Sequence, residues 1–147
     1  MSVGWNWMGT DRATRGASVI ELLSAVALLA LLLGSAAPSL QAAASGLRLR
    51  DASLRLVAAL ERSRAAALSR GHTWTVRAAT DSFTSGPLGE PGTREVLPAG
   101  VVFTATTSGG EVRFSPSGMA ENATFTLGLG ASARRVVINQ RGKVTCE

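Results

Sequence analysis

The stretch Arg15-Gly16-Ala17-Ser18-Val19-Ile20-Glu21-Leu22-Leu23 decides the fold of this chain, and the apolar run that follows it continues to Pro38. Between positions 19 and 37 almost every residue is Leu, Ala, Val or Ile. A run of about nineteen such residues is close to the ~20 that a helix needs to cross the hydrocarbon core of a bilayer. The sequence therefore predicts a transmembrane helix segment over residues 17–40.

One carboxylate lies near the start of this apolar run, at Glu21. A charged side chain at the centre of a membrane costs roughly 2.5–3.5 kcal/mol on insertion scales. An acid inside an apolar segment is therefore a candidate functional residue, and it requires a partner.

The N-terminal segment ends in Arg15-Gly16, Glu21 is the fifth residue after Gly16, and Pro38 lies seventeen residues beyond Glu21. This pattern resembles the class III signal of type IV prepilins and type II secretion pseudopilins. The resemblance implies that prepilin peptidase cuts after Gly16 and methylates the new amine of Ala17. Family members usually carry Phe or Met where this chain has Ala17.

The same resemblance assigns Glu21 and Pro38 to filament assembly. It implies that the Glu21 carboxylate pairs with the N-terminal amine of a neighbouring subunit when subunits stack. Two opposite charges in a dry, low-dielectric environment neutralise each other, and their pairing fixes the stagger between subunits.

A secretory signal peptide and a plain membrane anchor are the alternatives for this stretch. A secretory signal has an apolar region of about 7–15 residues followed by a small-x-small cleavage site. The run here is longer and contains an acid, but Ser35-Ala36-Ala37 resembles such a site, so both alternatives stay open. Residues 1–16 are expected to form a leader on the cytoplasmic side, with Met8 as an alternative start.

Composition leaves room for one modest domain beside the membrane helix. The chain has 147 residues and a net charge of +5, which becomes +4 once Asp11, Arg12 and Arg15 are removed with the leader. This balance permits contact with anionic lipid or nucleic acid without requiring either. Because Cys146 is the only cysteine, an intrachain disulfide is impossible.

Helical character continues from residue 41 to Arg70, and Gly71 is a suitable helix stop. Apolar residues recur there at helical spacing and predict one buried stripe. Its members are Leu49, Leu56, Leu60 and Ala67, with Ala52 and Ala59 beside them. The two segments together predict a helix over residues 17–70.

After Gly71 the sequence changes to short β-type runs separated by Gly, Pro and Ser. The expected strands are Thr73–Ala79, Arg94–Leu97, Val101–Thr106, Glu111–Phe114, Ala123–Leu129, Arg134–Asn139 and Lys143–Cys146. Positions 80–82 are interpreted as a turn, and Ser85–Gly92 as a loop because it holds two Pro and three Gly. The predicted class is α+β, with a long N-terminal helix packed on an antiparallel β-sheet domain over residues 72–147.

Three further segments resemble the H-type pseudopilin and FimT-like minor pilin family. They are Leu60–Gly71, Val112–Gly118 and Val136–Val144. The resemblance extends over nearly the whole chain from Arg15, and it implies the pilin-like form of the α+β fold.

The sequence predicts no catalytic, cofactor-binding or metal site. His72 is the only histidine, and no nucleophile and base accompany it in sequence. Residues 128–133 match a dinucleotide-binding G-x-G-x-x-A pattern, which requires a helix next. A strand follows instead, so we expect a glycine-rich hairpin.

DNA is the one chemical alternative. Some FimT-like minor pilins are DNA receptors for natural transformation and use an arginine-rich C-terminal tail. Arg134, Arg135, Arg141 and Lys143 fall within ten residues here and are candidates for phosphate contacts. The alternative interpretation is solvated charge at strand ends, because Gly142-Lys143-Val144-Thr145 carries a single basic residue.

The predicted function is that of a non-enzymatic minor pseudopilin of a type II secretion pseudopilus. The protein would be a single-pass inner-membrane protein with residues 41–147 in the periplasm. Its expected partners are other pseudopilins or pilins in a filament tip complex, prepilin peptidase and membrane lipid. A minor pilin of a type IV pilus and a FimT-like DNA receptor are the alternatives.

Overall fold

The computed structural model describes residues 18–147, apart from the side chains of residues 35–38. The chain divides into two compact units, one ending at Pro38 and the other comprising Ser39–Glu147. Helix α1 (Val19–Arg70) contributes to both units. The helix expected over residues 17–70 is confirmed from Val19 to Arg70. Ala17 lies outside the described residues.

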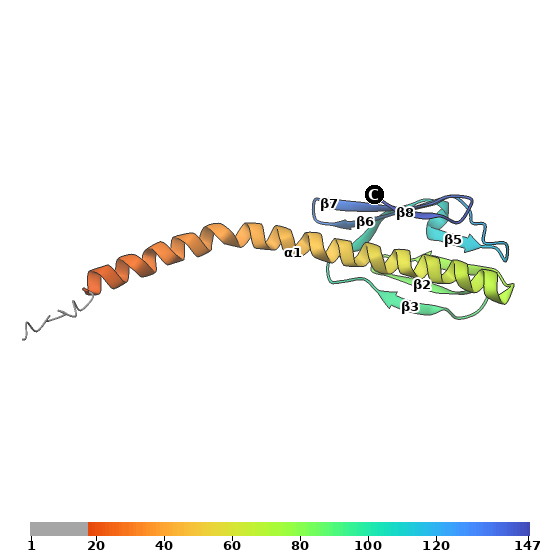
Figure 1. Cartoon of the computed structure of the whole chain (residues 1–147), viewed down its shortest axis with the longest axis horizontal. Coiled ribbons are helices and arrows are strands. Elements are labelled where there is room, and N and C mark those ends of the chain that lie inside the picture. The colour runs from red at the N-terminus through yellow and green to blue at the C-terminus, as the bar shows by residue number, and fades with distance from the viewer. Residues whose placement is uncertain (1–17) are drawn as a thin grey trace, which may run out of the picture. The chain divides into compact units, whose positions relative to one another are not determined.

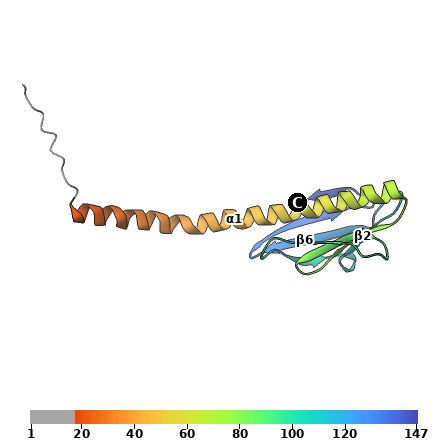
Figure 2. The ribbon, with the colours of Figure 1, turned by 90° about the horizontal axis from the view of Figure 1, so that it is seen from below.

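In the second unit, the predicted apolar stripe of α1 is the helical part of the core. Leu56 and Leu60 are fully buried, and the other members of the stripe are at most 3% exposed. They pack in one cluster with apolar side chains from the strands, among which Phe83, Phe114 and Phe125 are the largest. The C-terminal half of α1 lies along the strands in Figures 1 and 2.

Helix α1 ends at Arg70, directly before the predicted helix stop Gly71. Gly71 has φ +67°, and its N–H donates to the Ala67 carbonyl at 3.1 Å. Glycine adopts this left-handed conformation without the steric cost that a Cβ brings, which makes it the preferred residue just after a helix. The Arg70 guanidinium lies 5.3 Å from the ring centre of Trp74, which begins the first strand.

Four strands form the first antiparallel sheet, in the order β3-β2-β1-β5. They are β1 (Trp74–Ala78), β2 (Ser82–Pro87), β3 (Thr93–Val96) and β5 (Glu111–Phe114). Strand β2 was not predicted. The interpretation of residue 82 as part of a turn and of residues 85–87 as part of a loop is therefore wrong, whereas residues 80 and 81 form the predicted turn between β1 and β2.

Strand β2 forms because of its neighbours. It pairs with β1 on one side and β3 on the other, so its backbone groups are satisfied despite a sequence rich in Ser, Gly and Pro. Gly86 is required because a Cβ there would lie 2.6 Å from the Cα of Gly92. The segment before β3 thus passes directly against Gly86 of β2, and a side chain at Gly86 would prevent this close approach.

The other four strands form a second antiparallel sheet, in the order β4-β6-β7-β8. They are β4 (Val102–Thr106), β6 (Ala123–Leu129), β7 (Ser132–Ile138) and β8 (Val144–Cys146). A short 3₁₀ turn, η1 (Ser108–Gly110), connects β4 to β5. The glycine-rich segment forms the predicted hairpin, because Leu129 pairs with Ser132 around Gly130 and Ala131.

Candidate functional site

The apolar first half of α1 is the principal candidate site. Its large apolar side chains, from Val19 to Leu33, are more than half exposed. Within the part of the chain that the structure describes, α1 is the one helix long and apolar enough to cross a membrane. An exposed apolar surface of this length is unfavourable in water and matches the length of a membrane span.

Glu21 lies in the first turn of this segment and is exposed. The Glu21 N–H donates to the Ser18 carbonyl at 2.9 Å, and the Ser24 hydroxyl donates to the Glu21 carbonyl at 2.9 Å. Ser24 is thus satisfied within the helix and adds no unpaired polar group. Among the described residues the Glu21 carboxylate makes no ion pair, so its charge is available to a group from another molecule.

Two predicted site residues, Gly16 and Ala17, lie outside the described residues. Cleavage and methylation there therefore stay predictions. Pro38 lies inside α1, where a proline removes one backbone hydrogen bond. The carbonyl that loses this bond belongs to Gly34, four residues earlier.

The four C-terminal basic residues lie on β7 and in the segment between β7 and β8. Arg134 and Arg135 are consecutive residues of β7, so their side chains point to opposite faces of the sheet. Arg141 and Lys143 lie beyond the other end of β7, which is roughly 13 Å from Arg134 at the rise of a β-strand. The Arg135 guanidinium also lies 3.9 Å from the Glu147 carboxylate. Contact between these residues and a phosphate backbone therefore stays a prediction.

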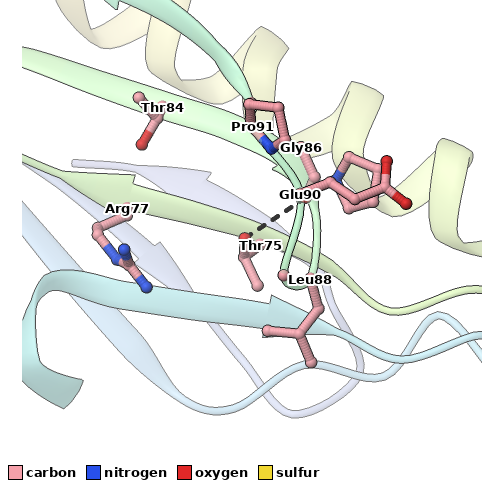
Figure 3. Close-up of a pocket in the computed structure, with 10 residues that line it drawn as sticks. Thr75, Arg77, Thr84, Gly86, Leu88, Glu90 and Pro91 are labelled. Carbon is pink, nitrogen blue, oxygen red and sulfur yellow. Dashed lines mark hydrogen bonds between the residues drawn. The ribbon is translucent and has the colours of Figure 1, made fainter.

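A pocket of about 400 Å³ lies on the first sheet, beneath the segment that connects β2 and β3 (Figure 3). Thr75 and Arg77 of β1 form part of its floor, and Leu88 and Glu90 line the connecting segment. The Thr75 hydroxyl donates to the Gly86 carbonyl at 3.4 Å. The Arg77 guanidinium is ion-paired with a glutamate of the neighbouring strand.

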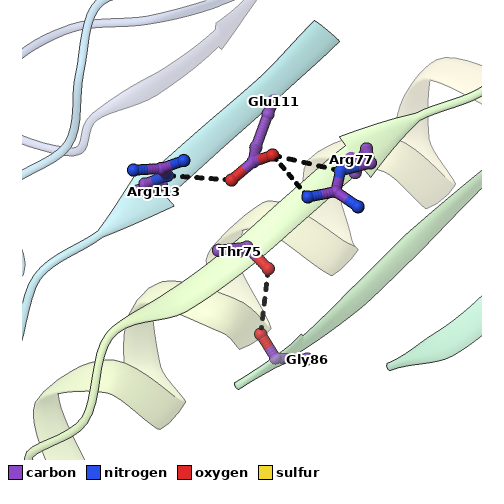
Figure 4. A network of polar contacts seen from close by, with 5 residues as sticks. All are labelled: Thr75, Arg77, Gly86, Glu111 and Arg113. Atoms are coloured by element: carbon purple, nitrogen blue, oxygen red, sulfur yellow. Dashed lines mark hydrogen bonds and ion pairs between the residues drawn. The ribbon is translucent and has the colours of Figure 1, made fainter. Parts of the chain in front are cut away.

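That glutamate is Glu111 of β5, which lies between two arginines (Figure 4). Arg77 donates to Glu111 Oε2 from Nε at 3.0 Å and from Nη2 at 2.7 Å, and Arg113 donates to Oε1 at 2.8 Å. The hydrogen bonds from Arg113 and then from Arg77 lower the pKa of the Glu111 carboxyl. This network was not predicted from the sequence. Strand register, which pairs Arg77 with Glu111, was the missing information.

The remaining polar candidates show no arrangement of catalytic type. His72 is exposed, and its Nδ1 forms a hydrogen bond of 2.6 Å with the Arg70 carbonyl. In residues 18–147 no three His, Cys, Asp or Glu side chains lie close enough together to hold a metal ion. The G-x-G-x-x-A segment begins in β6 and continues into β7, so no helix follows to bind a pyrophosphate.

A helix with an exposed apolar first half, joined to antiparallel strands that pack on its second half, defines the pilin-like class of proteins. Two solved structures share the fold. The type IV minor pilin FimU of Pseudomonas aeruginosa matches with a TM-score of 0.59 and 19% identity, over 67% of this chain and 87% of that one. The minor pseudopilin EpsH of the Vibrio cholerae type 2 secretion system matches with a TM-score of 0.58 and 15% identity, over 68% and 96%.

The family is shown by a sequence model. The model of the type II transport protein GspH matches residues 52–142, which is more than half of the chain, and the chain therefore belongs to the GspH family. No curated protein matches this chain in sequence. The predicted pilin-like fold and the predicted family are confirmed, and the protein is a minor pseudopilin, with type II secretion as its system.

Proposed function

We propose that this minor pseudopilin is held in the bacterial inner membrane by residues 17–40, with residues 41–147 in the periplasm. It joins other pseudopilins in a short filament, at or near the tip, and acts there as a structural subunit without enzymatic activity. The observation that carries the proposal is the exposed apolar half of α1, with one carboxylate at its start that makes no ion pair with any residue the structure describes.

The leader is removed after Gly16 by prepilin peptidase, which also methylates the amine of Ala17. Cleavage places a positive charge four residues before Glu21 in the sequence. A carboxylate held alone in hydrocarbon is unfavourable, whereas a carboxylate paired with an amine is neutralised. Pairing between the Glu21 of one subunit and the amine of its neighbour thus favours the assembled filament over the free subunit.

Replacement of Glu21 tests this pairing. Glu21→Val and Glu21→Gln remove the charge, and Gln keeps the size of the side chain. We expect both variants to be cleaved normally but to enter the filament at least about tenfold less, because losing one partner of a buried ion pair costs several kcal/mol. Incorporation is measured by crosslinking to the other pseudopilins in membranes, and cleavage by mass spectrometry of the mature N-terminus.

Glu90→Gln is the matched control, because Glu90 is an exposed acid in the segment between β2 and β3. It should be incorporated like the unmodified protein. Normal incorporation of both Glu21 variants would contradict the pairing. A mature N-terminus at Met1 or Met8, or beyond Ala37, would contradict the processing.

A further inference from the structure

A small cavity lies between the C-terminal half of α1 and the strands β1, β2 and β3. Its volume is about 220 Å³. Ser63 and Ala66 of α1 form part of its wall, together with Trp74 of β1 and Thr93 of β3. Sites for drug-sized ligands are larger, so a cavity of this volume suits a single amino-acid side chain.

Two polar groups on the wall of this cavity have no hydrogen-bond partner among the described residues. Ser63 is only 2% exposed, and its hydroxyl makes no hydrogen bond within residues 18–147. The Nε1 of Trp74 is also buried there without a partner. In contrast, Ser53, another buried serine of α1, donates to the Arg50 carbonyl at 2.8 Å. Because buried polar groups are normally satisfied, two unsatisfied ones beside one cavity indicate a ligand that supplies their partner.

The polar groups of the cavity suit a carboxamide. The indole N–H of Trp74 can only donate, so the ligand must bring an acceptor, which an ammonium lacks. A carboxamide oxygen accepts from Trp74 and Ser63, and its NH₂ group can donate to the Glu95 carboxylate, which also lines the cavity. A ligand carboxylate would lie beside Glu95, which already occupies Arg62 at 2.7 Å. An apolar side chain would leave both donors unsatisfied.

Strand β3, which lines the cavity, is an edge of the first sheet (Figure 1). The Leu97 N–H donates to the carbonyl of Asp81, just before β2, at 2.9 Å. Hydrogen bonds alternate in direction along a strand, so the N–H and C=O groups of Arg94 and Val96 point away from β2. Both residues are exposed. This edge can therefore bind a further strand through its backbone.

The edge and the cavity are in register with each other. Thr93 and Glu95 contribute side chains to the cavity, and alternate residues of a strand share one face. A segment paired with β3 would place every second side chain on the face that Thr93 and Glu95 share. One of those side chains can then enter the cavity while the backbone bonds to Arg94 and Val96.

We propose that β3 binds an extended polypeptide segment of another protein as a fifth strand of the first sheet, with an Asn or Gln side chain of that segment in the cavity. This inference goes beyond the proposed function, because neither the apolar half of α1 nor Glu21 takes part in it.

The test uses the full chain in detergent micelles and three labelled synthetic peptides with a lysine at each end. The first peptide alternates Thr and Val around a central Gln. The second has Leu in place of the Gln, and the third keeps the Gln but has methylated backbone nitrogens. Fluorescence anisotropy should show that the first peptide binds at least about tenfold tighter than either of the others.

Variants of the protein separate the cavity from the edge. Ser63→Ala and Trp74→Phe each remove one donor and keep the local shape, so each should weaken binding of the Gln peptide by about threefold to tenfold and leave the Leu peptide unchanged. Ser53→Ala is the matched control and should bind normally, because the Ser53 hydroxyl is bonded within α1. Val96→Pro removes an outward N–H and should weaken binding of both peptides, since an edge strand tolerates proline.

A stability measurement gives an independent readout of the cavity. Ser63→Ala should leave the melting temperature of the full chain unchanged or raise it, because the hydroxyl that it removes has no partner. A clear fall in melting temperature would show that the hydroxyl is satisfied within the fold, and it would overturn the assignment of Ser63 to a ligand site.

Equal affinity for the three peptides, or an unchanged affinity of both cavity variants, would also overturn the proposal. So would self-association of the full chain that Val96→Pro abolishes, because the occupant of the edge would then be a second copy. None of these outcomes depends on Glu21. A failure here therefore leaves the experiment on Glu21 to decide the proposed function.

Discussion

Replacing Glu111 by glutamine should destabilise the second unit, and the effect should depend on pH. The Glu111 side chain is only 15% exposed, but Arg77 and Arg113 are each more than half exposed. Exposed ion pairs contribute about 0.2–1 kcal/mol each after solvent screening. With two such pairs on one carboxylate, we expect Glu111→Gln to lower the free energy of unfolding by about 1 kcal/mol at pH 7.

The sign of the pH dependence follows from the lowered pKa of Glu111. In the unfolded chain a glutamate titrates near pH ~4.3, whereas in the folded protein the carboxyl stays charged to lower pH. Its contribution to stability is complete above the unfolded pKa and is lost as the pH falls through the folded one. The difference in free energy of unfolding between the unmodified protein and Glu111→Gln should therefore be complete at pH 7. It should disappear when the pH is below both the unfolded and the folded pKa of Glu111.

Urea unfolding of residues 39–147, followed by circular dichroism at several pH values, measures this difference. At 1 kcal/mol the melting temperature at pH 7 should also fall by about 4 °C or more for a domain of this size. Glu90→Gln is the control, and it should behave like the unmodified protein at every pH. An equal destabilisation at pH 7 and at the acid end, or none at either, would refute the role given to the two arginines.

Two further predictions concern packing. Leu60→Ala should lower the free energy of unfolding by about 2–5 kcal/mol because Leu60 is fully buried, whereas Leu54→Ala on the exposed side should change it by about 0.5 kcal/mol or less; chemical denaturation compares them. Gly142→Ala should cost more than Gly130→Ala. Both glycines have positive φ, but only at Gly142 would a Cβ also lie close to other atoms, among them Arg64 Nε at 2.8 Å. Thermal melting of the two variants that shows equal losses would contradict this.

The case of β2 shows where local sequence information is insufficient. Ser82–Pro87 has largely the composition of a loop, and within the segment only Phe83 and Thr84 favour an extended strand. It is a strand because β1 and β3 supply hydrogen-bonding partners on both sides. In contrast, Glu111–Phe114 and Ala123–Leu129 alternate or carry β-favouring side chains, and both were predicted with the bounds that the structure has.

The candidate site likewise has features that the sequence predicts and features that only the structure shows. The apolar segment and Glu21 could be recognised from the sequence, because a membrane span and an acid within it are properties of consecutive residues. The placement of Arg134 and Arg135 on opposite faces also follows from strand alternation once β7 is known. The ion pairs of Glu111 required the structure, since the register that pairs Arg77 with Glu111 is not visible in either strand alone.

The sequence by itself determined the long helix, its apolar first half, the buried stripe of its second half and the end at Gly71. These features depend on periodicity and on the conformational preferences of single residues, which act over a few positions. The tertiary structure alone decided the division of the strands into two sheets, the formation of β2 and the pairing of Glu111 with two arginines. Those features depend on strand register and on contacts between residues distant in sequence, which no short segment of the chain specifies.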